Sequence, residues 1–267
     1  PTFNMSCFCL TKKVCKKYTA NMAKYWWSSS LDKRSLHWIL WKSLASPKIN
    51  GGMGFRDMEL FNIALLGKHG WRFMTSLDSL CARVMKSRYF PNTDFMHATM
   101  SQSSSAIWRA IVAGREALRA GLIMRVGDGS SISVWNDKWI PGTIRMFPMI
   151  RPANSLIQFV QELIDDVNWR WKDDLIRNTF LAPDAEAILN IPLRNGGGED
   201  YFAWAFETSG VYFVKSAYRA LVNQKKRVAL EEGTATGTSQ TDQQTWTSLW
   251  KLKVVPKVRV LWWRVIR

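Results

Sequence analysis

The sequence is poor in the residues that build disulfide frameworks and metal centres. It has 4 cysteines and 3 histidines in 267 residues. So few cysteines do not form a disulfide framework, and reduced thiols in an intracellular protein are the simplest interpretation. Cys7, Cys9 and Cys15 follow a C-x-C-x5-C pattern, Cys81 stands apart, and no histidine lies at zinc-ligand spacing. The sequence therefore predicts no metal ligand and no cofactor.

Long hydrophobic runs are also missing. No apolar run approaches the roughly 18 residues that a membrane-spanning helix needs, so no membrane partner is predicted. The short apolar start, Met5–Leu10, precedes its lysines, which does not fit a secretory signal. We expect an intracellular protein, nuclear or cytoplasmic. The chain opens at Pro1 and not at methionine, which favours a fragment of a longer protein.

Motifs for catalysis are scarce. The only adjacent carboxylate pairs are Asp165-Asp166 and Asp173-Asp174. Two-metal nucleotidyl transfer needs carboxylates that converge from rigid elements, whereas both pairs here are typical of acids that complement helix starts. The histidines lie far apart, without a nucleophile arrangement that indicates a triad; they are His37, His69 and His97. No catalytic residue is predicted.

Positive charge is what the sequence has in excess. It carries 37 Lys+Arg against 21 Asp+Glu, a formal net charge of +16. Residues 1–90 hold 15 basic and 4 acidic side chains, whereas residues 151–233 hold 10 and 12. One basic element on a nearly neutral body indicates a polyanionic partner. RNA or DNA is the commonest such partner, because neutralised phosphates release counterions. A merely solvated surface is the alternative.

The most basic segment, residues 12–27, fits an amphipathic helix. Val14, Tyr18, Met22 and Tyr25 recur at helical spacing and predict a buried stripe, with most lysines outside it. The lysines are candidates for phosphate contacts, and the two tryptophans at the end of the segment for stacking on a base. The candidate nucleic-acid-binding residues are Lys12, Lys13, Lys16, Lys17, Lys24, Trp26 and Trp27.

The remaining patterns predict an α+β fold, predominantly helical, with two β-hairpins and a flexible linker near the C-terminus. Gly51–Gly54 lacks a phosphate-loop spacing and favours a tight turn, Asp57 favours a helix N-cap, and Trp135 and Trp139 are more typical of core residues than of base-stacking ones. We expect hairpins at 122–135 and 201–213. The helices are expected at 57–74, 79–88, 106–120, 156–165, 171–181, 184–189, 214–222 and from Pro256.

Several short motifs follow one another in a fixed order: Pro47–Asp57, Asn62–Lys68, Lys86–Pro91, Ser105–Trp108, Arg125–Gly129, Val134–Trp139, Gly210–Tyr218 and Trp250-Lys251 with Pro256–Val258. Together they resemble plant LINE-type (non-LTR) retrotransposon polyproteins. The similar region lies after the reverse-transcriptase core and runs into the start of the reverse-transcriptase zinc-binding domain. Each motif is weak alone, and their shared order carries the resemblance.

The sequence patterns and the resemblance together divide the chain into five segments. They are a basic helical thumb-like or linker segment (1–90), a helix plus hairpin (91–150), a small α+β segment (151–222), the flexible linker (223–245) and a truncated start of the zinc-binding domain (246–267). The family is an RNA-directed DNA polymerase, in some members with ribonuclease H. Its polymerase carboxylates would lie before Pro1 and its zinc cluster after Arg267, so neither is carried over here.

The resemblance and the charge together predict a non-catalytic, nucleic-acid-binding accessory fragment of such a reverse transcriptase. Its partners would be RNA or DNA, through the basic first third, and the remainder of the polyprotein. The alternative is a truncated or decayed element remnant, or a domesticated scaffold, without independent biochemical activity.

Overall fold

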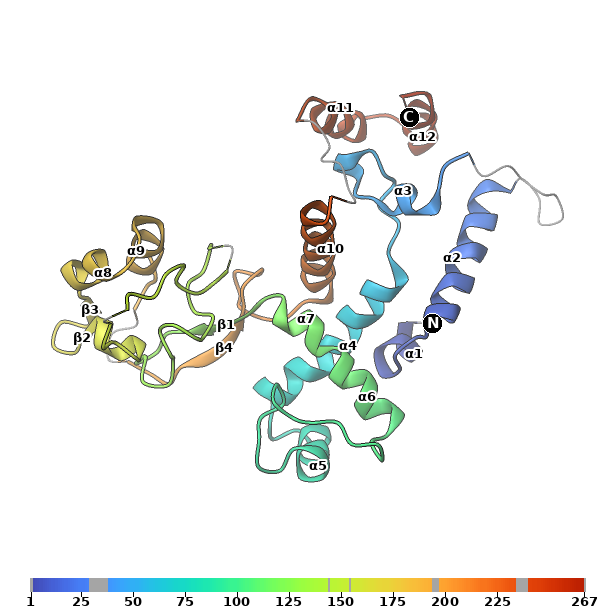
Figure 1. The fold of residues 1–267 in the computed structure, drawn as a ribbon. Helices are drawn as coiled ribbons and strands as arrows, with labels where there is room; N and C mark the ends of the chain where they lie inside the picture. Colours follow the sequence, from blue (N-terminus) through green and yellow to red (C-terminus); the bar gives the residue numbers. More distant parts are fainter. Residues whose placement is uncertain are drawn as a thin grey trace.

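The computed structural model describes residues 2–28, 38–143, 145–153, 155–193, 197–233 and 240–266. Helices dominate this part, together with two small two-stranded antiparallel sheets (Figure 1). The expected class, α+β and predominantly helical, is confirmed. The N-terminal half contains α1 (Thr2–Cys7), α2 (Lys12–Trp27), α3 (Trp41–Ala45), η1 (Lys48–Asn50), α4 (Met58–Thr75), α5 (Leu80–Tyr89), α6 (Ala106–Ala113), α7 (Arg115–Arg119) and β1 (Leu122–Arg125).

The C-terminal half begins with short elements and ends with long helices. It contains η2 (Val160–Leu163), β2 (Ile164–Asp165), β3 (Arg170–Trp171), α8 (Asp173–Thr179), α9 (Ala182–Leu189), β4 (Tyr201–Trp204), α10 (Val214–Glu231), α11 (Gln240–Lys251) and α12 (Pro256–Ile266).

Helix α4 is the centre of the largest hydrophobic cluster, which we call the central bundle. It packs against α1, α2, α5, α6, α7 and α10. A Cβ atom on Gly114 would lie 2.6 Å from the backbone nitrogen of Gly67, so these two glycines let α4 approach the α6–α7 junction closely. The large side chains Trp108 and Trp204 are fully buried in the same cluster.

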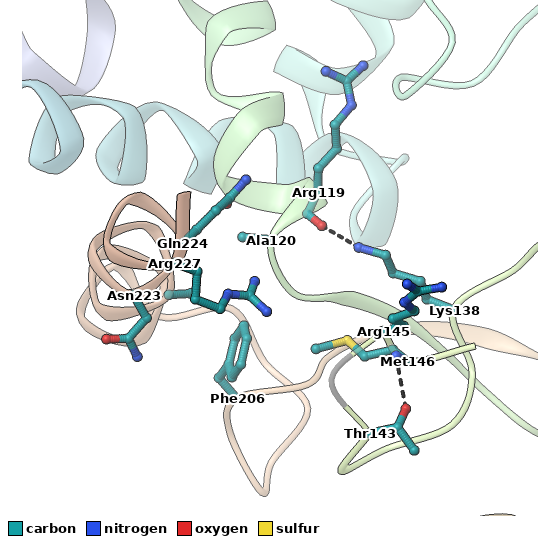
Figure 2. Close-up of a pocket in the computed structure, with 11 residues that line it drawn as sticks. Arg119, Ala120, Lys138, Thr143, Arg145, Met146, Phe206, Asn223, Gln224 and Arg227 are labelled. Carbon is teal, nitrogen blue, oxygen red and sulfur yellow. Dashed lines mark hydrogen bonds between the residues drawn. The ribbon is translucent and has the colours of Figure 1, made fainter. Parts of the chain in front are cut away.

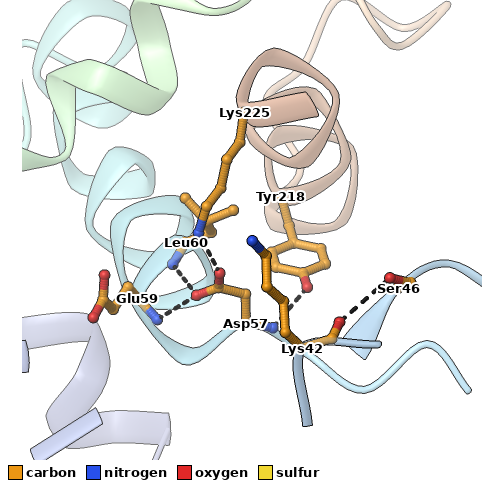
Figure 3. A network of polar contacts seen from close by, with 7 residues as sticks. All are labelled: Lys42, Ser46, Asp57, Glu59, Leu60, Tyr218 and Lys225. Atoms are coloured by element: carbon orange, nitrogen blue, oxygen red, sulfur yellow. Dashed lines mark hydrogen bonds and ion pairs between the residues drawn. The ribbon is translucent and has the colours of Figure 1, made fainter. Parts of the chain in front are cut away.

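The N-terminus of α4 is fixed by Asp57, as the sequence predicts. Its Oδ1 accepts hydrogen bonds from the backbone N–H groups of Glu59 at 3.0 Å and Leu60 at 3.3 Å. Its Oδ2 accepts a hydrogen bond from Lys225 Nζ at 2.9 Å, and its backbone N–H donates to the Tyr218 hydroxyl at 2.8 Å. Figure 3 shows these groups joining the start of α4 to α10. The cap therefore also holds two helices together.

A second lobe is built on residues 126–191, which form their own hydrophobic cluster. Trp139 is buried there and donates its indole N–H to the Val134 carbonyl at 2.9 Å, so its expected place in the core is confirmed. Trp135 is half-buried at the edge of this cluster and stacks on Phe180.

The strand partners differ from the expected hairpins. β1 pairs antiparallel with β4, so that Leu122 lies opposite Trp204 and Arg125 opposite Tyr201. Residues 132–135 and 211–213 form no strand, and a local strand pair joins β2 to β3 instead. The two expected hairpins are therefore wrong in their pairing. The first strand of the expected 122–135 hairpin pairs with the first strand of the expected 201–213 hairpin.

The C-terminal helices contribute to a third cluster, rich in tryptophan, which we call the tryptophan cluster. Trp246, Leu249 and Trp263 are buried together with Leu44. Gly51 and Gly54 have φ values of 77° and 72°, which fits the expected tight turn. The Trp263 indole N–H donates to the Gly51 carbonyl at 2.9 Å, so α12 is fixed directly to this turn.

The expected flexible linker at 223–245 is wrong at both ends. α10 continues to Glu231 instead of ending at residue 222, and α11 is already formed from Gln240. Residues 234–239 lie outside the described part. The other segment boundaries stay predictions, and the hydrophobic clusters join residues from different segments. Among the described residues, no helix combines the length and the apolar character needed to cross a membrane.

Candidate nucleic-acid interface

Helix α2 carries all seven of the predicted contact residues. Thr11 caps its N-terminus by accepting from the Val14 N–H at 3.4 Å, and the Ser28 N–H closes the other end on the Lys24 carbonyl at 2.9 Å. The helix lies at one edge of the molecule and packs on α4 (Figure 1). One side of α2 is therefore held by the central bundle, and the other side faces solvent.

The start of α2 is positioned by a buried asparagine of α4. Asn62 is 2% exposed, and its Oδ1 accepts the Leu10 N–H at 2.7 Å. Its Nδ2 donates to the carbonyls of Met5 at 2.6 Å and Phe8 at 2.9 Å. One side chain thus satisfies three backbone groups between α1 and α2, which fixes where α2 begins.

The buried face of α2 is not the expected apolar stripe. Cys15 and Ala23 are buried, whereas Val14, Tyr18 and Tyr25 are exposed. The exposed fractions of the tyrosines are 42% for Tyr18 and 80% for Tyr25. Small side chains lie on the face that meets α4, because they let the two helices approach closely. Burial raises the pKa of the Cys15 thiol, and the negative charge of Glu59 adds to this effect.

The lysines of α2 lie on one side of the helix, four of them in its first two turns and Lys24 near its end, and the buried Ala23 interrupts this side between the two groups. At about 100° per residue they span about 140° of the helix circumference, and the exposed tyrosines lie about 80–100° beyond the Lys17 edge of this arc. Within the described residues none of these lysines has a carboxylate partner. We call this surface the lysine face. Its five residues are all exposed: Lys12, Lys13, Lys16, Lys17 and Lys24.

The two tryptophans at the end of α2 point into the fold. Trp26 and Trp27 are half-buried and pack against the tryptophan cluster. Trp26 meets Phe55 edge-on, with ring centroids 5.1 Å apart, and the guanidinium of Arg264 lies 5.8 Å from the Trp27 ring. Their contact with a base stays a prediction. The structure shows Tyr18 and Tyr25 as the exposed aromatic rings of this helix.

A second basic site was not predicted from the sequence. A cavity of about 380 Å³ lies between the end of α7, the loop residues 138–143 and 145–146, and α10. Arg119, Lys138, Arg145 and Arg227 line it, beside Phe206. Figure 2 shows Arg227 extending from α10 toward Lys138 and Arg145, while the Arg119 guanidinium points away. These residues come from three distant segments, so no local motif indicates them.

The carboxylate pairs have local structural contacts. Asp165 accepts from the N–H of Val167 at 3.0 Å and from the Asn168 side chain at 2.8 Å, which orders the turn between β2 and β3. Asp173 lies in the first turn of α8 and pairs with Arg177 at 2.6 Å. The expectation of a helix-start acid fits Asp173, whereas Asp165 stabilises a turn instead.

Groups that could hold a metal do not gather in the described part of the chain. There, no three side chains of His, Cys, Asp and Glu come together as ligands. All four cysteines are free thiols. His97 pairs with Asp94 on the surface at 2.7 Å, His69 is half-buried in α4, and His37 lies outside the described residues.

Comparisons with known proteins give two relatives, both from Arabidopsis thaliana. The chain is 43% identical over 141 residues to "Uncharacterized mitochondrial protein AtMg00310". The aligned residues are 52% of this chain and 92% of that protein. It is 26% identical over 274 residues to "Putative ribonuclease H protein At1g65750", across 99% of this chain and 42% of that protein. The chain thus spans less than half of the longer relative. No protein-family profile matches it, and no solved structure does.

Proposed function

This chain belongs to the family of the Arabidopsis thaliana mitochondrial protein AtMg00310, and we propose that it binds RNA or DNA through the lysine face of α2. The observation that carries the proposal is the lysine face itself, five exposed cations on one helix without carboxylate partners in the described residues. Each ammonium group can contact one backbone phosphate, and the released counterions favour binding.

The lysine face is unfavourable for the helix alone. Lys12–Lys16 and Lys13–Lys17 are like-charge pairs one turn apart, each costing about 0.2–0.5 kcal/mol. Lys12 and Lys13 also stand in the first turn, which contains no acid and carries the positive end of the helix dipole. A phosphate backbone relieves this repulsion. The arrangement is therefore better explained by an anionic partner than by the stability of α2.

The exposed tyrosines extend the same surface. Tyr18 and Tyr25 lie about 80–100° around the helix from Lys17, within the reach of a flexible strand, and present their rings to solvent. An aromatic ring beside a cationic track is the usual construction for single-stranded nucleic acid, because bases stack on the ring while phosphates meet the cations. We therefore favour a single strand over a duplex as the ligand.

For the biological setting we propose an accessory, non-catalytic part of a non-LTR retrotransposon reverse transcriptase. Two findings support it: the order of motifs along the chain, and the ribonuclease H name of the longer relative. The local contacts of Asp165 and Asp173 favour a structural role for those carboxylates. The remainder of such a polyprotein is then the second partner. Nuclear or cytoplasmic location stays a prediction.

The proposal is tested by titrating the chain with a fluorescent oligoribonucleotide and a matching oligodeoxynucleotide over a range of salt concentrations. We expect binding at low salt that weakens linearly on a double-logarithmic plot, equally for different sequences. A Tyr25→Ala variant should bind more weakly without a change in salt slope, because stacking releases no counterion. Absence of binding at low salt, or binding without a salt slope, would contradict the proposal.

A second candidate function, a self-assembling scaffold, is favoured by α12. Leu261, Trp262 and Val265 are exposed on that helix, and a contiguous apolar face of this kind promotes association. Size-exclusion chromatography over a range of protein concentrations distinguishes the two functions. A concentration-dependent oligomer that does not bind nucleic acid would favour the scaffold, and a monomer would argue against it.

A further inference from the structure

The basic cavity between α7 and α10 concentrates positive charge without compensation. Arg119, Lys138, Arg145 and Arg227 line it, and no acidic residue does. Within the described residues no carboxylate forms an ion pair with any of the four. Bringing cations together is costly unless an anion lies between them, since like charges repel most strongly where water is partly excluded.

Lys138 shows this repulsion most directly. It is half-buried, and its Nζ donates to the Arg119 carbonyl at 2.6 Å at the end of α7. Burial and the nearby positive charge of Arg227 both lower the pKa of Lys138. The ammonium group therefore meets another cation where a salt bridge would be the ordinary arrangement. An anionic group between Lys138 and Arg227 would reverse this disadvantage.

The cavity also has an apolar wall and neutral polar groups. Phe206 is 45% exposed and is held edge-on by the buried Trp204, with ring centroids 5.4 Å apart. Asn223 and Gln224 add amide donors and acceptors from α10. Figure 2 shows Phe206 beside Arg227, which places a ring next to the cations. A volume of about 380 Å³ falls within the range of small-ligand sites.

We propose that this cavity binds one nucleotide unit of a nucleic-acid strand, with its phosphate between Lys138, Arg145 and Arg227 and its base against Phe206. Guanidinium groups suit phosphate because they donate paired, charge-assisted hydrogen bonds. The inference deepens the proposed function and rests on it for the polynucleotide source. A free nucleotide presents the same phosphate and base, so the experiment separates the two sources.

The test compares two double variants of the full chain. The cavity variant combines Arg145→Gln with Arg227→Gln, and its matched control combines Arg72→Gln with Arg83→Gln. All four arginines are exposed and make no ion pair in the described part, so both variants should fold, which circular dichroism checks. Affinities are measured by calorimetry for inorganic phosphate and adenosine 5′-monophosphate, and by fluorescence anisotropy for a short oligothymidylate.

We expect the cavity variant to lose at least about tenfold in affinity for the monophosphate and the oligonucleotide, and the control variant less than about twofold. Phe206→Ala should weaken both of these ligands while leaving inorganic phosphate unchanged, because only the former carry a base. If the wild-type chain binds the oligonucleotide but not the monophosphate, and the cavity variant no longer binds the oligonucleotide, the ligand of the cavity is a polynucleotide strand and not a free nucleotide.

The outcomes separate the two proposals. Equal oligonucleotide affinities in the cavity and control variants, with loss only when lysines of α2 are replaced, would overturn the cavity inference and leave the proposed function intact. Monophosphate binding that needs Arg145 and Arg227, without any oligonucleotide binding, would overturn the proposed function while the cavity still binds a nucleotide. No binding of any of the three ligands would overturn both.

Discussion

Replacing four lysines of α2 by glutamine should change how nucleic-acid binding depends on salt. The variant combines Lys12→Gln, Lys13→Gln, Lys16→Gln and Lys17→Gln, which removes four of the five cations of the lysine face. Glutamine keeps a similar length and a good helix propensity, so α2 should remain formed. The change therefore removes charge from the surface and leaves the packing on α4 in place.

The magnitude follows from counterion release. Each phosphate contact on a single strand contributes about 0.7 to the slope of log K against log salt concentration, so four lost contacts reduce the slope by about 3. Between about 50 and 200 mM salt, that difference corresponds to about 50-fold in affinity. The wild-type chain should therefore weaken about 50-fold more than the variant over this range.

Fluorescence anisotropy with a labelled single strand at several salt concentrations measures both slopes. The matched control replaces four exposed lysines elsewhere, which lowers the net charge equally; these are Lys68, Lys215, Lys251 and Lys253. Its slope should stay within about 1 of the wild-type value. Equal slope changes in the two variants would refute a localised interface, because the effect would then follow the total charge alone.

Three further predictions concern the scaffold of this interface. Lys12→Glu should raise the free energy of unfolding by about 1 kcal/mol at low salt, because it places an acid in the first turn of α2. Thermal melting with and without added salt checks this prediction. Asn62→Ala should lower the free energy of unfolding by about 2–4 kcal/mol in urea melts, because buried backbone groups lose their hydrogen bonds. Amide hydrogen exchange should then become faster in α1 and α2 before it does in α4. Burial lowers the pKa of His69 below its ordinary value of 6.5. Just below pH 6.5 the folded state therefore binds fewer protons than the unfolded state. The free energy of unfolding should fall as the pH drops from 6.5 to the lower pKa of the folded state. His69→Gln should flatten that part of a pH-dependent unfolding series, and an unchanged slope would contradict the assignment.

Sequence patterns predict the local features of this chain well. The cap at Asp57 and the core position of Trp139 each depend on chemistry within a few residues, and both are present. The exposure of the lysines of α2 follows in the same way from their charge.

Features that depend on distant partners could not be predicted. The face of α2 that meets α4 is marked by the small residues Cys15 and Ala23, and a search for large apolar residues selects the opposite, exposed side. The polarity of residues 223–231 predicts a linker, although their lysine, arginine, alanine and leucine all favour the helix that forms. The cavity residues Lys138 and Arg227 are 89 positions apart in the sequence and only the fold brings them together.

The pairing of β1 with β4 makes the second lobe a removable module. Arg125 and Tyr201 are direct antiparallel partners, so their Cα atoms lie within about 5.5 Å of each other. A two-residue Asn-Gly turn therefore fits the gap that residues 126–200 now fill. None of the buried residues of the central bundle comes from that interval. Excision should leave a shorter chain that still folds with α2 in place, at a cost in stability because Met146 no longer covers Ile123 and Ala203.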